Sequence, residues 1–498
     1  MQIRVIFFCI FVPVMKPDKD QLFSFIRNGQ QLTVKEQVSL TAKLSVPAIM
    51  TQISFILVQY IDASMVGHLG AEASAAVGLM STSTWLLGGL CECMVAGFSV
   101  LVAHKIGACR NGDAKNVLRQ AFTVCLSWGI LLSFFGMMVS DYLPKWLNGG
   151  DEIAQMASNY FFIFAAGIPF FQLDYLSASM LRSSGNIKVP SILNVIMCVL
   201  DVFFNFLLIY PERHFSVSGI DLVIPGADLG VPGAALGSVL AFVTTSGIMT
   251  WYLVCRSKEL KIKGENGSFR PEKETLQRAL KISVPIGCER LIMCLGAIIV
   301  TAIIAPLGNV SIAADTFAIT IEGLCYMPGY GIADAASTLV GQCVGAGRKL
   351  LAKSFAKITV IVSMSILTVM AVIMFVCAPF MFSLMTDNQE IVELGTVILR
   401  IEAFAEPFFG AAIVCYSVFV GAGNSLLPNF INLGSMWLIR IPLVMFVAQS
   451  YGLTGVWAAM CFELIIRGTV FLFVLRSPKW LDTQAVREAE RAKATSAL

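Results

Sequence analysis

The stretch LVAHKIGACRNGDAKN at residues 101–116 returns in altered form as LVGQCVGAGRKLLAKS at residues 339–354, and this recurrence decides the fold. The two stretches lie 238 residues apart. At this offset two further pairs match: LSVP (44–47) with ISVP (282–285), and RSSGNIKVPSILN (182–194) with VGAGNSLLPNFIN (420–432). Matching glycines, prolines and loop charges indicate more than shared hydrophobicity. The chain therefore consists of two copies of one unit.

The composition places these copies in a membrane. Of 498 residues 57% are hydrophobic and 13% charged, against about 25% charged in soluble domains. Apolar runs of about 20 residues, enough to cross ~30 Å of hydrocarbon, occur near 44–66, 75–104, 117–140, 153–180, 190–210, 232–255, 284–306, 312–343, 355–384, 393–420, 428–449 and 453–475. We predict an all-α integral membrane protein with twelve transmembrane helices.

The predicted helices divide into two six-helix lobes. Because six is even, both lobes cross the membrane in the same sense and are related by an axis along the membrane normal. After the fifth helix the first copy has a longer outside loop, and VPGAA (231–235) then pairs with LTGVW (453–457). The predicted parts are an N-terminal cytoplasmic segment (1–34), an N-lobe (35–255), a cytoplasmic tether (256–281), a C-lobe (282–476) and a cytoplasmic tail (477–498). Residues 1–15 form a short apolar run without a cleavage site, so a native start at Met15 is an alternative.

The lysines and arginines predict the orientation. With a cytoplasmic N-terminus, 28 of the 35 lie in inside segments, whereas only Lys145 and Arg213 lie in outside loops. This bias predicts that both termini are cytoplasmic, in a plasma (inner) membrane. The net charge of +3 reports this topology and predicts no nucleic-acid partner. We expect a monomer surrounded by lipid.

Two parallel lobes are typical of secondary transporters, in which a substrate path between the lobes opens alternately to each side. An enzyme is not expected, because no nucleophile with a base and no cluster of metal ligands stands out. GRKLLAKS (347–354) approaches a phosphate loop but has Ala352 in place of the second glycine and follows a membrane helix,. We predict no ATP site, no disulfide framework and no cofactor.

The ionisable residues inside the predicted helices do not repeat. At the offset of 238, Asp62 meets Val300 and Asp201 meets Ile439. The same holds for a further set: Glu92, Asp174, Glu289, Glu402 and Glu406. Charges in membrane helices are costly and mark functional sites. The two lobes therefore share a duplicated scaffold, but each carries its own ionisable residues.

Asp62 and Asp201 are the predicted ion-coupling pair. They lie ~27 Å and ~17 Å up the first and fifth helices at 1.5 Å per residue, so both can face the interior of the N-lobe. Burial and a like-charged neighbour both favour the neutral carboxyl, as exchange of a proton or a sodium ion requires. Supporting polar residues are Asn194, Asn205 and Ser238, and the alternative is that these residues hold purely structural carboxylates. Apart from sodium at this pair, no metal is expected.

The C-lobe offers Glu402, Glu406 and Glu289 as candidates for binding substrate or ion. Glu289 precedes Arg290, so an interfacial ion pair is the alternative for this residue. Arg440 is predicted to pair with Glu402 or Glu406.

The last helix carries Glu463 and Arg467 at i, i+4, a spacing that places both on one face. This spacing predicts a structural ion pair.

Several motifs together resemble the multidrug and toxic compound extrusion (MATE) family: YIDASMVGHLG (60–70), both copies of the turns quoted above, and LGVPGAALGSV (229–239). The resemblance covers about residues 35–475. It implies a two-lobe antiporter that exports amphipathic, often cationic, organic molecules against an inward flow of protons or sodium ions. It also implies that Asp62, Asp201 and Ser238 occupy polar N-lobe positions of the family.

The chain departs from the family pattern at three places. Met197 stands where one branch has an asparagine, Met293 where another has a glutamate, and helix ten offers Glu402 and Glu406 in place of an aspartate. The choice between proton and sodium stays open. The alternative function is a flippase of lipid-linked precursors from the same superfamily, which would need a cationic cavity.

Overall fold

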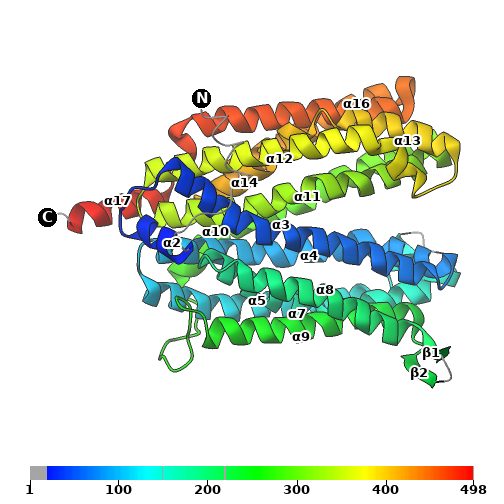
Figure 1. The fold of residues 1–498 in the computed structure, drawn as a ribbon, viewed down its shortest axis with the longest axis horizontal. Coiled ribbons are helices and arrows are strands. Elements are labelled where there is room, and N and C mark those ends of the chain that lie inside the picture. Colours follow the sequence, from blue (N-terminus) through cyan, green and yellow to red (C-terminus); the bar gives the residue numbers. More distant parts are fainter. Residues whose placement is uncertain (1–18, 148–149, 218–219, 497–498) are drawn as a thin grey trace. The chain divides into compact units, whose positions relative to one another are not determined.

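A computed structural model describes residues 19–147, 150–217 and 220–496, so the expectation about Met15 lies outside the described residues. The first copy contains α3 (Val34–Gly67), α4 (Ala71–Gly107), α5 (Asn111–Val139), α7 (Asp151–Ser183), α8 (Lys188–Ile209) and α9 (Gly230–Cys255) (Figure 1). The second contains α10 (Lys273–Ile304), α11 (Asn309–Gly345), α12 (Lys349–Ser383), α13 (Gln389–Glu402), α14 (Glu406–Gly421), α15 (Leu426–Ser435), the π-helix η2 (Met436–Arg440) and α16 (Ile441–Arg476).

The described helices confirm the twelve predicted spans. Ten are long and apolar enough to cross a membrane, and α13 with α14 forms an eleventh, bent by 56° at the break. One of the ten, Leu426–Arg476, runs for 51 residues, more than twice the length that a crossing needs,. Its backbone leaves the helical conformation at Gly452 (φ 57°, ψ −147°), which divides it into two spans.

The turns between helices repeat in backbone detail. Gly185 and Gly423, 238 residues apart, have φ of 90° and 87°. Cys109 and Gly347 form a second pair, with φ of 58° and 64°. A left-handed residue closes a helix end by turning the chain back onto its last carbonyls. Cys109 adopts this conformation without being glycine, so the fold requires the turn even where the sequence gives no glycine signal.

The chain forms two compact units: residues 1–53, 103–110 and 284–498 in one, and 54–102 and 111–283 in the other. In the second of these units α7 packs against both α5 and α9, and α8 packs against α9. In the other, α11 packs against α12 and α14, and α14 packs against α16. The lobe boundaries predicted from the repeat stay predictions.

Two glycines, one from each copy, permit equivalent close contacts within the unit that contains residues 103–110 and 284–498. A Cβ on Gly107 would lie 2.2 Å from the backbone oxygen of Gln342, and a Cβ on Gly345 would lie 2.0 Å from that of His104. Residues 104 and 342, like 107 and 345, are 238 apart. The ends of α4 and α11 therefore cross in a contact that each copy supplies in the same way.

The remaining elements are α2 (Lys19–Arg27), α6 (Leu143–Trp146), β1 (Pro211–Val217), β2 (Ile220–Ala227), η1 (Ala305–Leu307), η3 (Pro478–Leu481) and α17 (Gln484–Ser496). The long loop of the first copy, predicted to lie outside, is an antiparallel β1–β2 hairpin, which the sequence analysis predicted only as a loop. In the described part of the chain every cysteine is a free thiol.

Candidate functional site

The N-lobe site is built around Asn205. Asp201 and Asn205 lie one turn apart on α8 and are 2% and 0% exposed, and Asp62 of α3 faces them. The Asn205 Nδ2 donates to Asp62 Oδ1 at 2.9 Å and to Asp201 Oδ2 at 3.3 Å. One neutral amide thus holds two carboxylates, and the two carboxylates also act on each other electrostatically.

Two acceptors at this site have no hydrogen-bond partner among the described residues: Asp201 Oδ1 and Asn205 Oδ1, both buried. The Ser238 hydroxyl of α9 lies within reach of the Asp201 side chain. Among the described contacts, Asn194 makes none with Asp62 or Asp201. Buried acceptors without a donor are costly. The oxygens gathered here would be satisfied by a proton or by a small hard cation such as sodium.

The candidate C-lobe carboxylates Glu402 and Glu406 lie on either side of the bend between α13 and α14. Each is 1% exposed. Neither oxygen of Glu406 has a hydrogen-bond partner in the described part of the chain, and neither does Glu402 Oε2. Glu322 of α11 acts electrostatically on both. The structure therefore gathers three acidic side chains in the C-lobe, of which the sequence analysis named two.

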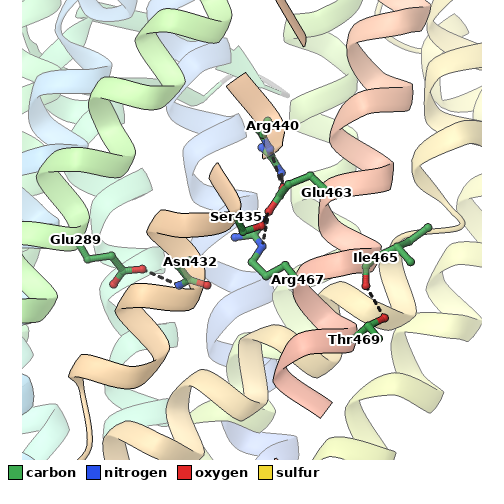
Figure 2. Close-up of polar contacts among 8 residues, drawn as sticks. All are labelled: Glu289, Asn432, Ser435, Arg440, Glu463, Ile465, Arg467 and Thr469. Atoms are coloured by element: carbon green, nitrogen blue, oxygen red, sulfur yellow. Dashed lines mark hydrogen bonds and ion pairs between the residues drawn. The ribbon is translucent and has the colours of Figure 1, made fainter. Parts of the chain in front are cut away.

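Glu289 is 5% exposed on α10. Its carboxylate accepts a 2.7 Å hydrogen bond from the Tyr416 hydroxyl of α14. It accepts a second one, also of 2.7 Å, from the Asn432 amide of α15 (Figure 2). Packing against two helices distant in sequence determines these two partners, and the interfacial pair with Arg290 stays a prediction.

The predicted pairing of Arg440 with Glu402 or Glu406 is wrong. The Arg440 Nη2 lies 2.6 Å from Glu463 Oε2 (Figure 2). The predicted pair of Glu463 with Arg467 is confirmed, with the Arg467 Nε 3.1 Å from Glu463 Oε1. Glu463 therefore binds both arginines, whereas the sequence analysis assigned them to separate pairs.

Three side chains near these sites were missed. Glu322 and Asp315 interrupt the apolar run 312–343, so a systematic search for carboxylates within predicted spans would have found them. Asp315 accepts a 2.9 Å hydrogen bond from the Trp457 indole. Tyr160 of α7 lies close enough to Asp62 and Asp201 to interact with both, and no sequence signal marks it.

No group of three or more His, Cys, Asp or Glu residues suited to a metal ion occurs in residues 19–147, 150–217 and 220–496. The oxygens around Asn205 come from two carboxylates, an amide and a hydroxyl. They form a set that suits a proton or an alkali cation better than a transition metal.

Comparisons with known proteins agree with the repeat. The family model MatE matches residues 47–207 and again 285–446, more than half of the chain, and the two matches begin 238 residues apart. The probable multidrug resistance protein NorM of Thermotoga maritima is 25% identical over 454 residues, covering 91% of this chain and 94% of the relative. The multidrug resistance protein MdtK of Yersinia pestis is 23% identical over 471 residues, covering 91% and 97%.

A solved MOP superfamily transporter from Pyrococcus furiosus has the same fold, with a TM-score of 0.83 at 20% identity, covering 94% of this chain and all of that one. The family model matches both copies, the helices form twelve spans, and the turns repeat in backbone detail. The chain therefore belongs to the MatE family.

Proposed function

We propose that this chain is a secondary active antiporter that exports amphipathic, cationic organic compounds in exchange for protons or sodium ions by alternating access. The observation that carries the proposal is the Asn205 amide shared by Asp62 and Asp201, beside two buried oxygens without donors. Two carboxylates with one neutral donor cannot both stay ionised at low cost in a membrane interior. A proton or a sodium ion neutralises the pair.

Coupling follows if the ion binds one conformation more tightly than the other, because a ligand shifts an equilibrium only by its differential affinity. Asp62 is on α3 and Asp201 on α8, so loss of the bound ion changes the force between two helices. We propose that ion entry favours a different packing of α3 and that this change releases the exported compound.

The substrate class rests on the C-lobe. Glu402 and Glu406 present buried carboxyl oxygens without donors, and Glu322 adds a third acidic side chain. Such a group suits the cationic part of an organic molecule. The multidrug resistance names of NorM and MdtK support drug-like compounds. Glu289 stays a candidate, although both of its oxygens already have donors.

The alternative, a flippase of lipid-linked precursors, requires cations that can bind a pyrophosphate. Arg440 and Arg467 of the C-lobe both form ion pairs with Glu463. The site at Asn205 brings together carboxylates. Because the arginines are paired and the carboxylates are gathered, the sites favour export of a cation. An enzymatic activity is not part of the proposal.

The experiment uses purified protein in vesicles with a fluorescent cationic dye, and imposes pH and sodium gradients separately. We expect one gradient to drive dye movement in the wild type. Asp62→Asn and Asp201→Asn should each remove ion-dependent transport and leave part of the dye binding. The control is Asp387→Asn, an exposed carboxylate between α12 and α13, which should transport normally.

Unchanged ion coupling in both amide variants would reject the coupling site. Movement of a lipid-linked oligosaccharide, with no response to any dye, would support the flippase instead.

The proposed plasma-membrane topology is tested with reporters. One fused after Arg476 should be cytoplasmic and one inserted within 211–230 should be external, whereas finding both on the same side would contradict twelve crossings.

A further inference from the structure

Glu463 on the last membrane helix holds three side chains at once. Its carboxylate accepts a hydrogen bond from the Ser435 hydroxyl and forms ion pairs with Arg440 and Arg467 (Figure 2). The Arg440 Nε also donates to Oε2 at 2.8 Å, and the Arg467 Nη2 donates to the same oxygen at 3.3 Å. The side chains of Glu463, Arg440 and Arg467 are only 1%, 14% and 9% exposed. We call these three residues the triad.

Two partners of Glu463, Ser435 and Arg440, flank a π-helix. Ser435 is the last residue of α15, and Arg440 is the last residue of the π-helix η2, Met436–Arg440. π-helical turns are rare and occur frequently at functional positions. Asn432, one turn before Ser435, donates to Glu289 of α10. Polar contacts therefore tie the segment from Asn432 to Arg440 to α10 on one side and to the last span on the other.

The triad also places positive charge beside the C-lobe carboxylates. Both Arg440 and Arg467 act electrostatically on Glu322 and on Glu402. Glu463 engages both guanidinium groups, so its position determines where these two charges lie. A shift of Glu463 would therefore change the electrostatic environment of the carboxylates that we propose to bind the substrate.

A stable fold does not generally require a buried ion triad. Buried ion triads are often replaced by apolar side chains without loss of stability, because desolvation of the charges offsets their attraction. The first copy has uncharged residues at all three positions. Arg440 aligns with Val202 at the offset of 238. In the pairing of 231–235 with 453–457, Glu463 aligns with Ala241 and Arg467 with Thr245. Val202 and Ala241 belong to one apolar cluster of the N-lobe.

We infer that Glu463 is a positioning residue of the transport cycle. It fixes the π-helical segment of η2 and holds Arg440 and Arg467 against the C-lobe carboxylates, and the fold itself does not need it. This role rests on the proposed export of cations, because it concerns the side chains that would bind them. It assigns Glu463 to the conformational step and not to direct contact with substrate.

The test replaces the whole triad by apolar residues of similar size: Glu463→Leu, Arg440→Met and Arg467→Met in one chain. We expect this variant to insert and to melt in detergent at the wild-type temperature or above it. In vesicles its maximal rate of dye export should fall by about tenfold or more, a factor that corresponds to ~1.4 kcal/mol. Its KM for the dye should stay within about twofold, since substrate binding is retained and conversion is impaired.

A conservative variant separates charge from shape. Arg440→Lys keeps a cation that can reach Glu463 and should retain most of the maximal rate, whereas Arg440→Met should not. The control for loss of an ion pair is Asp482→Asn with Arg487→Gln, a pair whose side chains are 62% and 63% exposed, which should export normally.

The outcomes are distinct. A wild type that moves no dye under any gradient rejects the proposed function. If the wild type exports and the apolar triple variant exports equally well, the proposed function stands and the positioning role is wrong. A triple variant that fails to fold also overturns the inference, because the triad would then be a structural requirement.

Discussion

Asp201 in the N-lobe and Glu463 in the C-lobe are both almost completely buried, with 2% and 0% of their surfaces exposed, yet the charges of their partners differ. Asp201 shares a neutral amide with a second carboxylate, and one of its oxygens has no donor. Glu463 has two guanidinium groups and a hydroxyl. Cationic partners stabilise the ionised form of a buried carboxyl group, whereas a second carboxylate nearby disfavours it.

The comparison teaches that the two copies share one scaffold and that each carries its own charges. The turns at Gly185 and Gly423 retain the same backbone conformation. In contrast, the position of Asp62 in the first copy is Val300 in the second, which packs in the large apolar cluster of the C-lobe. The two lobes are therefore alike in backbone and unlike in chemistry.

The largest expected effect comes from moving the charge between copies. Val300→Asp in the Asp62→Asn background should restore no ion-dependent export, because position 300 lies among apolar side chains and offers no equivalent of Asn205. Val300→Asp alone should destabilise the protein by ~2.5–3.5 kcal/mol, the cost of an acidic residue within a membrane helix. Dye export in vesicles and melting in detergent measure the two effects. Restored export would show that the lobes are interchangeable and would break the comparison.

A smaller effect is expected where the copies are alike. Gly107→Ala and Gly345→Ala each place a Cβ against a backbone oxygen of the other crossing helix, at 2.2 and 2.0 Å. Because backbone must shift, each variant should lose ~1–3 kcal/mol of stability. The matched control is Gly112→Ala on α5, where nothing lies within 4 Å. It should be neutral or slightly stabilising, since alanine favours a helix. Melting temperatures that differ strongly between the Gly107 and Gly345 variants would contradict an equivalent contact.

The sequence predicted what local patterns determine. Apolar runs located the spans, the offset of 238 located the equivalent turns, and i, i+4 spacing paired Glu463 with Arg467. The fifth helix brought Asp201 into the interior beside Asp62 as expected. These features depend on spacing along one helix or on comparison between the copies, and both can be read from one chain.

Lateral packing determined the rest. Arg440 reaches Glu463 on the next span, and Glu289 reaches Tyr416 and Asn432, because the helices carrying them lie side by side. Helical periodicity reports which residues share a face, but it does not report which neighbouring helix covers that face. The π-helix and the left-handed Cys109 depend on backbone adjustments that leave no clear composition signal.

The smallest expected effect lies in the tether between the copies. Residues 256–272 contact α5, where the Lys115 ammonium bonds to the Glu265 carboxylate, Arg119 donates to the Glu265 carbonyl at 3.2 Å, and Thr123 donates to that of Phe269 at 2.8 Å. The hydrogen bond from Lys115 lowers the pKa of Glu265 below its ordinary value of 4.5. A lowered carboxyl pKa contributes stability that is present above the unfolded-state pKa and is lost as the pH falls through the folded-state pKa.

Glu265→Gln should therefore remove a small, acid-sensitive part of the stability while the backbone contacts of the tether remain. The effect is small because Glu265 is exposed and surface ion pairs are screened by solvent. Melting temperatures of the wild type and the variant, measured at about pH 7 and about pH 3, should differ slightly at the higher pH and converge at the lower one. The control is Asp387→Asn, the exposed residue between α12 and α13, which should leave the melting temperature unchanged. A difference that persists undiminished at low pH would mean that Glu265 stabilises the contact between the tether and α5 through its shape, and the ion pair with Lys115 would then have no part in that contact.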